Sequence, residues 1–451
     1  MSDRYGELVQ SSLGRKVAKN LGLPMPIKLD RYEEGQPILR GEVAFGSAGD
    51  GVVKQTVGGV LTALDAKITT EATLDERLTD ENARFKVAIF DVTNIKNVDG
   101  LKAVYDFFHK IARKIKPSGR IIVIARPECC TGTDIGFALA QRSVLGFIKS
   151  IGKEFKKGIT ANAIYVQEGA ESHLPHALHF FMSAKSAYVS GQPVILKKGV
   201  DAQLDHFDSS QPLKGKKILV TGASRGIGES IAEVLTRDGA MLYCLDVPNN
   251  LSDLQKVAGN LGAKALPLDI TDPTAAQQII QACGVLDGVV HNAGVTQDKT
   301  LANMSEEKWD LVLNVNLKAI ADINQYLLDH DGLSDDARVV CVSSISGIAG
   351  NLGQTNYATS KAGVIGLVNA TAKLFDGTAR TINAVAPGFI ETKMTGAIPF
   401  AIREAGRRMN AMSQGGEPVD VAETIAWLLS PKASGLNGNV VRVCGLSVLG
   451  A

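Results

Sequence analysis

Short apolar runs alternate with helical patterns through the second half of the chain. The runs suited to strands are Lys217–Thr221, Met241–Val247, Ala263–Ile270, Asp287–His291, Arg338–Ser343, Thr381–Ala386 and Asn439–Val443. Because strands joined by crossover helices form parallel sheets, this alternation predicts a doubly wound α/β domain. A polar, turn-rich stretch, Asp201–Pro212, precedes it and predicts a linker. We therefore expect two domains, residues 1–205 and 206–451.

The first half resembles the second half, segment by segment, in the same order. The paired segments are Lys86–Ile89 with Gly288–His291, Arg120–Ile124 with Arg338–Val342, Ser143–Lys149 with Gly363–Asn369, Thr160–Val166 with Thr381–Pro387, and Met182–Leu196 with Leu429–Val443. One explanation of this shared order is an internal duplication, and the alternative explanation is the general likeness of any two α/β domains. Duplication predicts that the first domain is a degenerate Rossmann or flavodoxin-like copy.

Composition narrows the classes of partner and compartment. A net charge of +1 gives no field of one sign, which argues against nucleic acid or a membrane surface as the main partner. The six cysteines lack C-x-x-C spacing, and the chain shows neither a leader pattern nor a run of about 18 apolar residues. We expect a cytoplasmic protein without disulfides.

A glycine cluster follows the strand pattern Lys217–Thr221 and opens a helical pattern. It comprises Gly222, Ser224, Arg225, Gly226, Ile227 and Gly228. Such a turn lets backbone N–H groups approach a pyrophosphate at a helix N-terminus. The next strand ends at Asp246, where a carboxylate can bond an adenosine ribose and repel a 2′-phosphate, whereas Arg225 could pair with that phosphate. The pattern favours NAD(H) and leaves NADP(H) possible, and Asp246 could also be a solvated turn residue.

Five motifs follow one another along residues 213–451: TGASRGIG, HNAG at His291–Gly294, NVN at Asn314–Asn316, Ser343–Gly363 and Ala384–Thr392. Together they make this region similar to the short-chain dehydrogenase/reductase family, and within it to the 3-oxoacyl-[acyl-carrier-protein] reductase type, here in a high-molecular-weight form with an extra N-terminal domain. The resemblance implies that the cofactor is also bound by Asp269, Ile270, Asn292, Ala293, Gly294, Tyr357, Lys361, Pro387, Gly388, Ile390 and Thr392.

Tyr357 and Lys361 lie four residues apart in a helical pattern, which places them on one face. The adjacent cation, together with the charge of the cofactor, is expected to stabilise a phenolate, so that Tyr357 serves as general acid in reduction. Ser344 can donate a hydrogen bond to the substrate carbonyl oxygen. By resemblance, Asn316 positions a water that leads to Lys361. Taken alone, a Tyr-x-x-x-Lys pair is more often an ordinary helix-surface pair.

In the first half, Arg126 corresponds to Ser344, Phe137 to Tyr357 and Gln141 to Lys361. The glycine segment of the first half, Gly46–Gly51, lacks the spacing of the cofactor-binding glycines. We expect a catalytically silent domain that takes the place of a neighbouring subunit, which predicts a homodimer imitating a tetramer.

Two further segments invite interpretation. Residues 394–412 mix apolar side chains with arginines, and they suit either a lid over an acyl thioester or an amphipathic helix with a solvated basic face. His173, His176 and His179 are expected to be exposed histidines, with no metal site, because Pro175 interrupts their helix.

These features together predict an NADH-preferring reductase of 3-oxoacyl thioesters carried by acyl-carrier protein or coenzyme A. The alternatives are an acetoacetyl-CoA reductase, a 3-hydroxyacyl-CoA dehydrogenase working in the oxidative direction, and a dinucleotide-sensing scaffold.

Overall fold

The computed structural model describes residues 3–200, 207–396 and 398–448. The chain forms two compact units. The first comprises Met1–Lys198, Pro399–Gly415 and Cys444–Val448, and the second comprises Gly199–Ile398, Gly416–Val443 and Leu449–Ala451. The predicted boundary between residues 205 and 206 lies outside the described residues.

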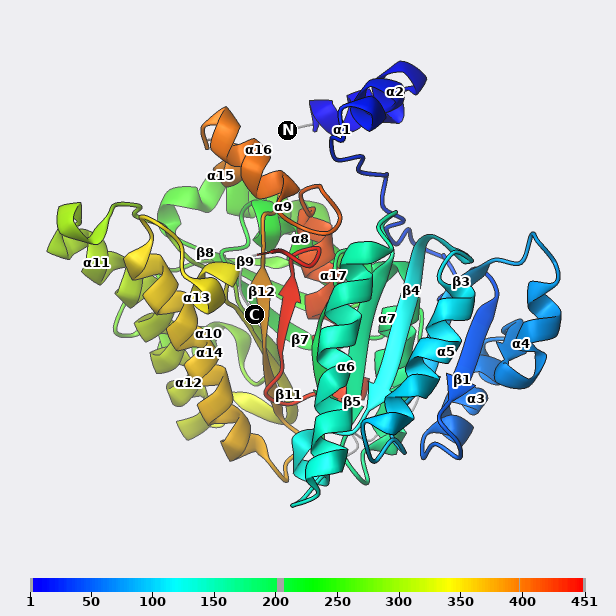
Figure 1. Ribbon diagram of the computed structural model, residues 1–451. Helices are drawn as coiled ribbons and strands as arrows, with labels where there is room; N and C mark the ends of the chain where they lie inside the picture. The colour runs from blue at the N-terminus through cyan, green and yellow to red at the C-terminus, as the bar shows by residue number, and fades with distance from the viewer. Residues whose placement is uncertain (1–2, 201–206, 397, 449–451) are drawn as a thin grey trace. The chain divides into compact units, whose positions relative to one another are not determined.

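The first unit contains a six-stranded sheet in the order β2-β1-β3-β4-β5-β6, with every described pairing parallel. This order extends the flavodoxin-like arrangement by one strand. Helices α5 and α6 pack on one face of the sheet (Figure 1), where Phe107, Phe108 and Ile148 are buried. The elements are α1 (Arg4–Gln10), α2 (Ser12–Asn20), β1 (Val43–Ser47), α3 (Lys54–Ala63), β2 (Ile68–Thr70), α4 (Glu71–Leu78), β3 (Phe85–Asp91), α5 (Lys102–Ile111), β4 (Ile115–Ala125), α6 (Ile135–Glu154), β5 (Thr160–Val166), α7 (Leu174–Met182), β6 (Pro193–Leu196) and α16 (Phe400–Arg408).

The second unit contains a seven-stranded parallel sheet in the order β13-β12-β11-β10-β7-β8-β9, the doubly wound Rossmann order with one added strand. The two predicted parallel sheets are therefore confirmed. The elements are β7 (Lys217–Thr221), α8 (Gly226–Arg237), β8 (Met241–Asp246), α9 (Leu251–Leu261), β9 (Lys264–Pro267), α10 (Ala275–Cys283), β10 (Leu286–His291), α11 (Glu306–Leu313), the π-helix η7 (Asn314–Lys318), α12 (Ala319–Asp329), β11 (Leu333–Val342), α13 (Ile345–Ala349), α14 (Thr355–Phe375), β12 (Thr381–Pro387), α15 (Lys393–Gly396), α17 (Pro418–Leu429) and β13 (Val440–Val443).

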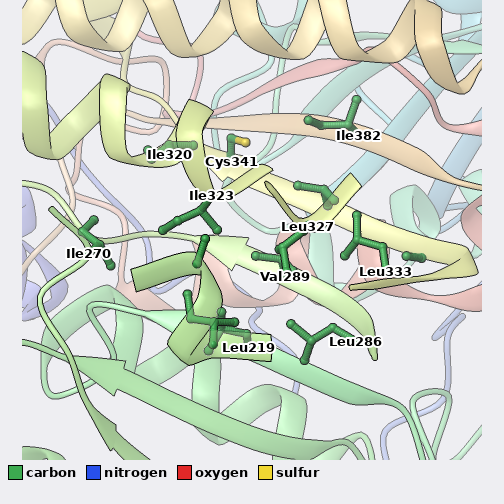
Figure 2. Packing of buried hydrophobic residues seen from close by; sticks show 14 of the residues in the cluster. Leu219, Ile270, Leu286, Val289, Ile320, Ile323, Leu327, Leu333, Cys341 and Ile382 are labelled. Carbon is green, nitrogen blue, oxygen red and sulfur yellow. The ribbon is translucent and has the colours of Figure 1, made fainter. Parts of the chain in front are cut away.

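The core on one side of this sheet is built from α12 and the strands beneath it. Figure 2 shows Ile320, Ile323 and Leu327 of α12 close to Leu219 of β7 and Val289 of β10. All five are almost completely buried. This packing fixes β7 and β10, whose carboxyl ends lead into the predicted cofactor residues Gly222 and Asn292.

Matched buried arginines support the duplication. Arg120 pairs with Val87 in the first sheet as Arg338 pairs with Gly288 in the second. Both side chains are buried, and each donates from Nε to a serine carbonyl, Arg120 to Ser183 at 3.0 Å and Arg338 to Ser430 at 3.4 Å. A general likeness of α/β domains does not require the same buried charge with the same partners.

A second matched pair strengthens this interpretation. Asn162 of β5 accepts a hydrogen bond from the backbone N–H of Gln192, at 3.1 Å. Asn383 of β12 accepts one from Asn439, at 2.9 Å. Both asparagine side chains also donate to a backbone carbonyl. The two sheets therefore share details of side-chain chemistry as well as strand order.

None of the described helices is both long enough and apolar enough to cross a membrane.

Candidate active site

The turn between β7 and α8 is one that only glycine can form. Gly222 has a φ of +67°, and a Cβ added there would lie 2.9 Å from the Cα of Ala293. A Cβ added at Gly228 would lie 2.0 Å from the carbonyl oxygen of Gly222. The turn therefore brings bare backbone to the N-terminus of α8, and a cradle of this kind fits the pyrophosphate of a dinucleotide.

The end of β10 is fastened to this turn. Asn292 donates from Nδ2 to the carbonyls of Thr221, at 3.0 Å, and Gly222, at 3.1 Å. The backbone N–H of Ala293 donates to the Thr221 hydroxyl. These bonds hold the predicted cofactor residues of β10 against those of β7.

Asp246 lies at the end of β8 and is only 9% exposed, which argues against a solvated turn residue. Its Oδ2 accepts from the backbone N–H of Ser224 at 3.1 Å, and its Oδ1 accepts from Val247 and Asn250. Arg225 is exposed at the start of α8. The carboxylate is thus fixed beside the glycine turn, while the guanidinium extends into solvent.

The remaining predicted cofactor residues follow β9, β12 and the next loop. Ile270 is buried, whereas Asp269 is exposed and accepts hydrogen bonds from Thr271. Pro387 ends β12, and Gly388, Ile390 and Thr392 continue into the loop. A Cβ added at Gly226 would lie 3.9 Å from Cγ2 of Thr392, so this loop passes close to the start of α8.

Tyr357 and Lys361 lie on α14, as the spacing predicts, and the Lys361 Nζ lies 5.7 Å from the Tyr357 ring centroid. Lys361 is buried and donates to the carbonyl of Val342 at 2.8 Å. Ser344 follows β11 and forms a side-chain hydrogen bond with Tyr357. The structure therefore brings these three predicted catalytic residues together.

Asn316 lies in the π-helix η7, a local irregularity that the sequence did not predict. Its side-chain amide accepts from the backbone N–H of Val295 at 2.8 Å and donates to the Val295 carbonyl at 2.9 Å. It also donates to the Ser360 hydroxyl at 3.2 Å. A Cβ added at Gly294 would lie 3.2 Å from Asn316 Oδ1 and 3.4 Å from Lys361 Nζ, so the two side chains meet beside Gly294.

Burial dominates the ionisation of the Tyr357–Lys361 pair. It raises the pKa of Tyr357 above its usual 10.0, although the hydrogen bond with Ser344 acts in the opposite direction. It also lowers the pKa of Lys361 from 10.5 to about 8. The protein alone therefore favours the neutral phenol, because desolvation outweighs the effect of the Lys361 cation, which is not bonded to the phenol. The stabilised phenolate that the sequence predicted also relied on the charge of the cofactor.

The corresponding positions of the first unit are occupied by structural contacts. Gln141 donates to the carbonyls of Val92 and Ile95, each at 2.9 Å, and accepts from the backbone N–H of Arg126. The Arg126 guanidinium pairs with Glu171 at 2.9 Å. Phe137 carries no ionisable group, so these three positions offer no group suited to proton transfer.

The glycine segment of the first unit is filled rather than open. A Cβ added at Gly51 would lie 1.9 Å from Oδ2 of Asp91 and 2.4 Å from the Ser47 hydroxyl. Asp91 is fully buried, and its Oδ1 accepts two hydrogen bonds from Thr93. A carboxylate packed under this turn opposes the approach of a phosphate.

The expected exposure of the three histidines on α7 needs correction. His173 is buried, and His176 and His179 are partly buried, because α7 packs on the first sheet, so the expected exposure is wrong. Within the described ranges, no three His, Cys, Asp or Glu side chains gather as a metal site.

Helix α16 does not have the solvated basic face that one interpretation required. Arg407 is buried and forms an ion pair with Glu404, while Phe400 and Ile402 are 70% and 66% exposed.

Fold and site together define an oxidoreductase that uses a nicotinamide dinucleotide. Residues 222–445 match the family model described as Enoyl-(Acyl carrier protein) reductase. A 3-oxoacyl-[acyl-carrier-protein] reductase of Thermotoga maritima is 40% identical over 240 residues, which are 52% of this chain and 98% of that protein. The corresponding protein of Vibrio cholerae is 37% identical, over 52% of this chain and 97% of its own length. An acetoacetyl-CoA reductase of a Synechocystis species is 40% identical, over 52% of this chain and 96% of its length.

A solved chain from Agrobacterium tumefaciens, with bound NADP, is 32% identical over 53% of this chain and 98% of its own, with a TM-score of 0.48. The chain belongs to the short-chain dehydrogenase/reductase family, and the predicted resemblance to 3-oxoacyl-[acyl-carrier-protein] reductases is confirmed.

Proposed function

We propose that this protein reduces 3-oxoacyl thioesters, carried by acyl-carrier protein or coenzyme A, to 3-hydroxyacyl thioesters, with NADH preferred over NADPH. The observation that carries the proposal is the meeting of Ser344, Tyr357 and Lys361 at the carboxyl end of the sheet. The relatives named for reducing 3-oxoacyl and acetoacetyl thioesters support the substrate class.

Tyr357 is the general acid of the proposed reaction. The nicotinamide cofactor supplies the hydride. The neutral Tyr357 hydroxyl donates its proton to the carbonyl oxygen as negative charge develops there, and the Ser344 hydroxyl donates a second hydrogen bond to the same oxygen. Lys361, held beside Asn316, returns a proton to Tyr357.

Asp246 accounts for the proposed cofactor preference. Its fixed carboxylate beside Ser224 can accept hydrogen bonds from ribose hydroxyls, whereas a 2′-phosphate would bring like charges together. Arg225 is exposed and lacks such fixation, so its attraction for a 2′-phosphate is weaker.

Acetoacetyl-CoA is the favoured alternative substrate because a reductase of that name is as similar as the carrier-protein reductases. The oxidative direction uses the same residues with Tyr357 as base. The intact catalytic set argues against a dinucleotide-sensing scaffold. The first domain is proposed to be catalytically silent, and the protein is proposed to act in the cytoplasm as a homodimer.

Initial rates with acetoacetyl-CoA and with longer 3-oxoacyl-CoA substrates, each with NADH and with NADPH, test the proposal. We expect reduction with NADH to be faster at limiting cofactor, and Asp246→Ala to shift the ratio of kcat/KM toward NADPH by at least about tenfold. Arg225→Ala is the matched control and should leave the preference for NADH in place. Absence of turnover with every 3-oxoacyl thioester would refute the substrate assignment.

A further inference from the structure

Ser360 lies directly before Lys361 on α14, and its hydroxyl joins this helix to the π-helix η7. The side chain is fully buried. Its hydroxyl donates to the carbonyl of Tyr357, three residues earlier on the same helix, at 2.8 Å. Because a hydroxyl has a single hydrogen, only the lone pairs of this oxygen remain for a second partner. That partner is Asn316, whose Nδ2 donates to the Ser360 oxygen at 3.2 Å.

This bond completes the hydrogen bonding of the Asn316 amide nitrogen. One of the two Nδ2 hydrogens goes to the Val295 carbonyl at 2.9 Å, and the other goes to Ser360. The Oδ1 atom accepts from the Val295 N–H at 2.8 Å and keeps a second lone pair. A Cβ added at Gly294 would lie 3.2 Å from this oxygen and 3.4 Å from the Lys361 Nζ. The amide therefore directs its nitrogen toward Ser360 and presents an acceptor beside the ammonium.

Removal of the Ser360 hydroxyl would leave one N–H of Asn316 without its partner. Both side chains are fully buried, so water does not readily replace the lost bond. Asn316 lies within a π-helix, where the regular helical hydrogen bonding is interrupted. We therefore expect the side-chain contact to contribute to the local order of η7 and to the orientation of the amide.

The first unit shows that the fold itself does not require a hydroxyl at this position. Ala140 precedes Gln141 on α6 as Ser360 precedes Lys361 on α14. Like Ser360, Ala140 is fully buried. The hydroxyl thus occurs in the unit that carries the candidate catalytic residues, whereas alanine packs at the matched position of the unit that lacks them. Packing alone does not account for Ser360.

We infer that Ser360 is a positioning residue for the return of the proton to Tyr357. This inference rests on the proposed function, in which Tyr357 gives its proton to the carbonyl oxygen and receives another from Lys361. Lys361 then takes a proton from solvent, so the site regains its starting state after each turnover. Ser360 acts through Asn316, because it holds the amide with Oδ1 beside Lys361 and keeps this side of the ammonium in one arrangement.

Ser360→Ala in the full-length protein tests the inference. The substitution removes only the hydroxyl oxygen, and Ala140 indicates that alanine packs at this position. Ser360→Thr keeps the hydroxyl and serves as the conservative variant. Thr424→Val is the matched control, because Thr424 is fully buried on α17 and its hydroxyl donates to the carbonyl of Asp420 on the same helix, at 2.9 Å.

The rates separate proton return from the first reduction step. For Ser360→Ala we expect a kcat for reduction of acetoacetyl-CoA that is about five- to tenfold lower, with the KM for NADH and for the thioester within about twofold of wild type. The single-turnover rate should stay within about twofold of wild type, because Tyr357 begins the turnover already protonated. Ser360→Thr and Thr424→Val should each keep at least about half of the wild-type kcat.

Amide hydrogen exchange tests the contact without any substrate. Exchange across residues 314–318 should be about fivefold faster in Ser360→Ala and unchanged in Thr424→Val. Unchanged exchange in Ser360→Ala would overturn the proposed positioning of Asn316. An unchanged kcat, an equal fall of kcat and of the single-turnover rate, or a Ser360→Thr variant as slow as Ser360→Ala would overturn the role in proton return. A wild-type protein inactive on every 3-oxoacyl thioester would refute the proposed function instead, and the exchange result would still decide whether Ser360 holds η7.

Discussion

Lys361 combines a buried position with a strongly lowered pKa. Its ammonium donates to the Val342 carbonyl, and burial lowers its pKa from 10.5 to about 8. A group with this pKa exchanges protons readily in the range where the proposed reaction operates. The same burial keeps Tyr357 protonated, as a general acid must be.

Proposed proton return through Lys361 predicts a specific pH profile. Because Lys361 loses its proton as the pH rises through about 8, kcat for reduction should fall above that pH while the affinity for NADH stays nearly constant. Steady-state rates between pH 6 and 10, with NADH binding followed in parallel, would check this. A reductive kcat that stays level to pH 10 would contradict the role of Lys361.

His291 should make the second unit sensitive to acid. It is buried against Asn324, at 2.8 Å, and burial lowers its pKa from 6.5 to about 4. Between these values the unfolded chain binds the proton and the folded chain does not, so stability is lost as the pH falls from 6.5 to 4, by up to about 3 kcal/mol. Urea unfolding at several pH values should show this slope, and His291→Gln should flatten it. An equal slope in the variant would assign the acid sensitivity to other groups.

At the scale of elements, the turn between β7 and α8 makes a sharp prediction. Gly222→Ala forces a side chain into a left-handed conformation and against Ala293, so we expect a loss of about 1–3 kcal/mol in stability and at least tenfold weaker NADH binding. Thermal unfolding and fluorescence titration measure the two effects. The control is Gly259→Ala in α9, where the added Cβ meets nothing within 4 Å and should increase stability by about 0.5–1 kcal/mol. Equal behaviour of the two variants would show that the turn does not need glycine.

The sequence predicted elements well where one local pattern determines them. The residues Lys217–Thr221 form a strand at the predicted bounds, because alternation with helical patterns defines buried parallel strands. The run Ala263–Ile270 shortens to β9, Lys264–Pro267, where Asp269 binds Thr271 and the chain turns. The π-helix at Asn316 was not predicted, and the hydrogen bonds that its side chain forms join it to Val295 and Ser360, which lie far along the chain.

At the scale of the whole molecule, the ion pair between Arg408 and Asp3 escaped prediction because its partners lie far apart in the sequence. Arg408 and Asp3 are separated by 405 residues, and no periodic pattern connects them. The mixture of apolar residues and arginines in residues 394–412 was visible in the sequence. Of its two interpretations, the amphipathic helix with a solvated basic face is wrong, because Arg407 is buried and Phe400 is exposed.

The proposed oligomeric state can be measured directly. A duplicated, silent domain in place of a neighbouring subunit predicts a dimer of two chains of 47.7 kDa each. Light scattering coupled to size-exclusion chromatography should therefore give about twice the mass of one chain. A monomer, or a tetramer of full-length chains, would contradict the proposal.

The most direct test of the central claim is a comparison of wild type with Tyr357→Phe, in which NADH binding and single-turnover reduction of acetoacetyl-CoA are measured on the same preparations. The proposed role predicts that NADH binds within about threefold of wild type, while the rate of reduction falls by at least about 10³-fold, because the proton donor is lost. Reduction by the variant at a rate near that of wild type would contradict the claim that Tyr357 is the general acid of this site.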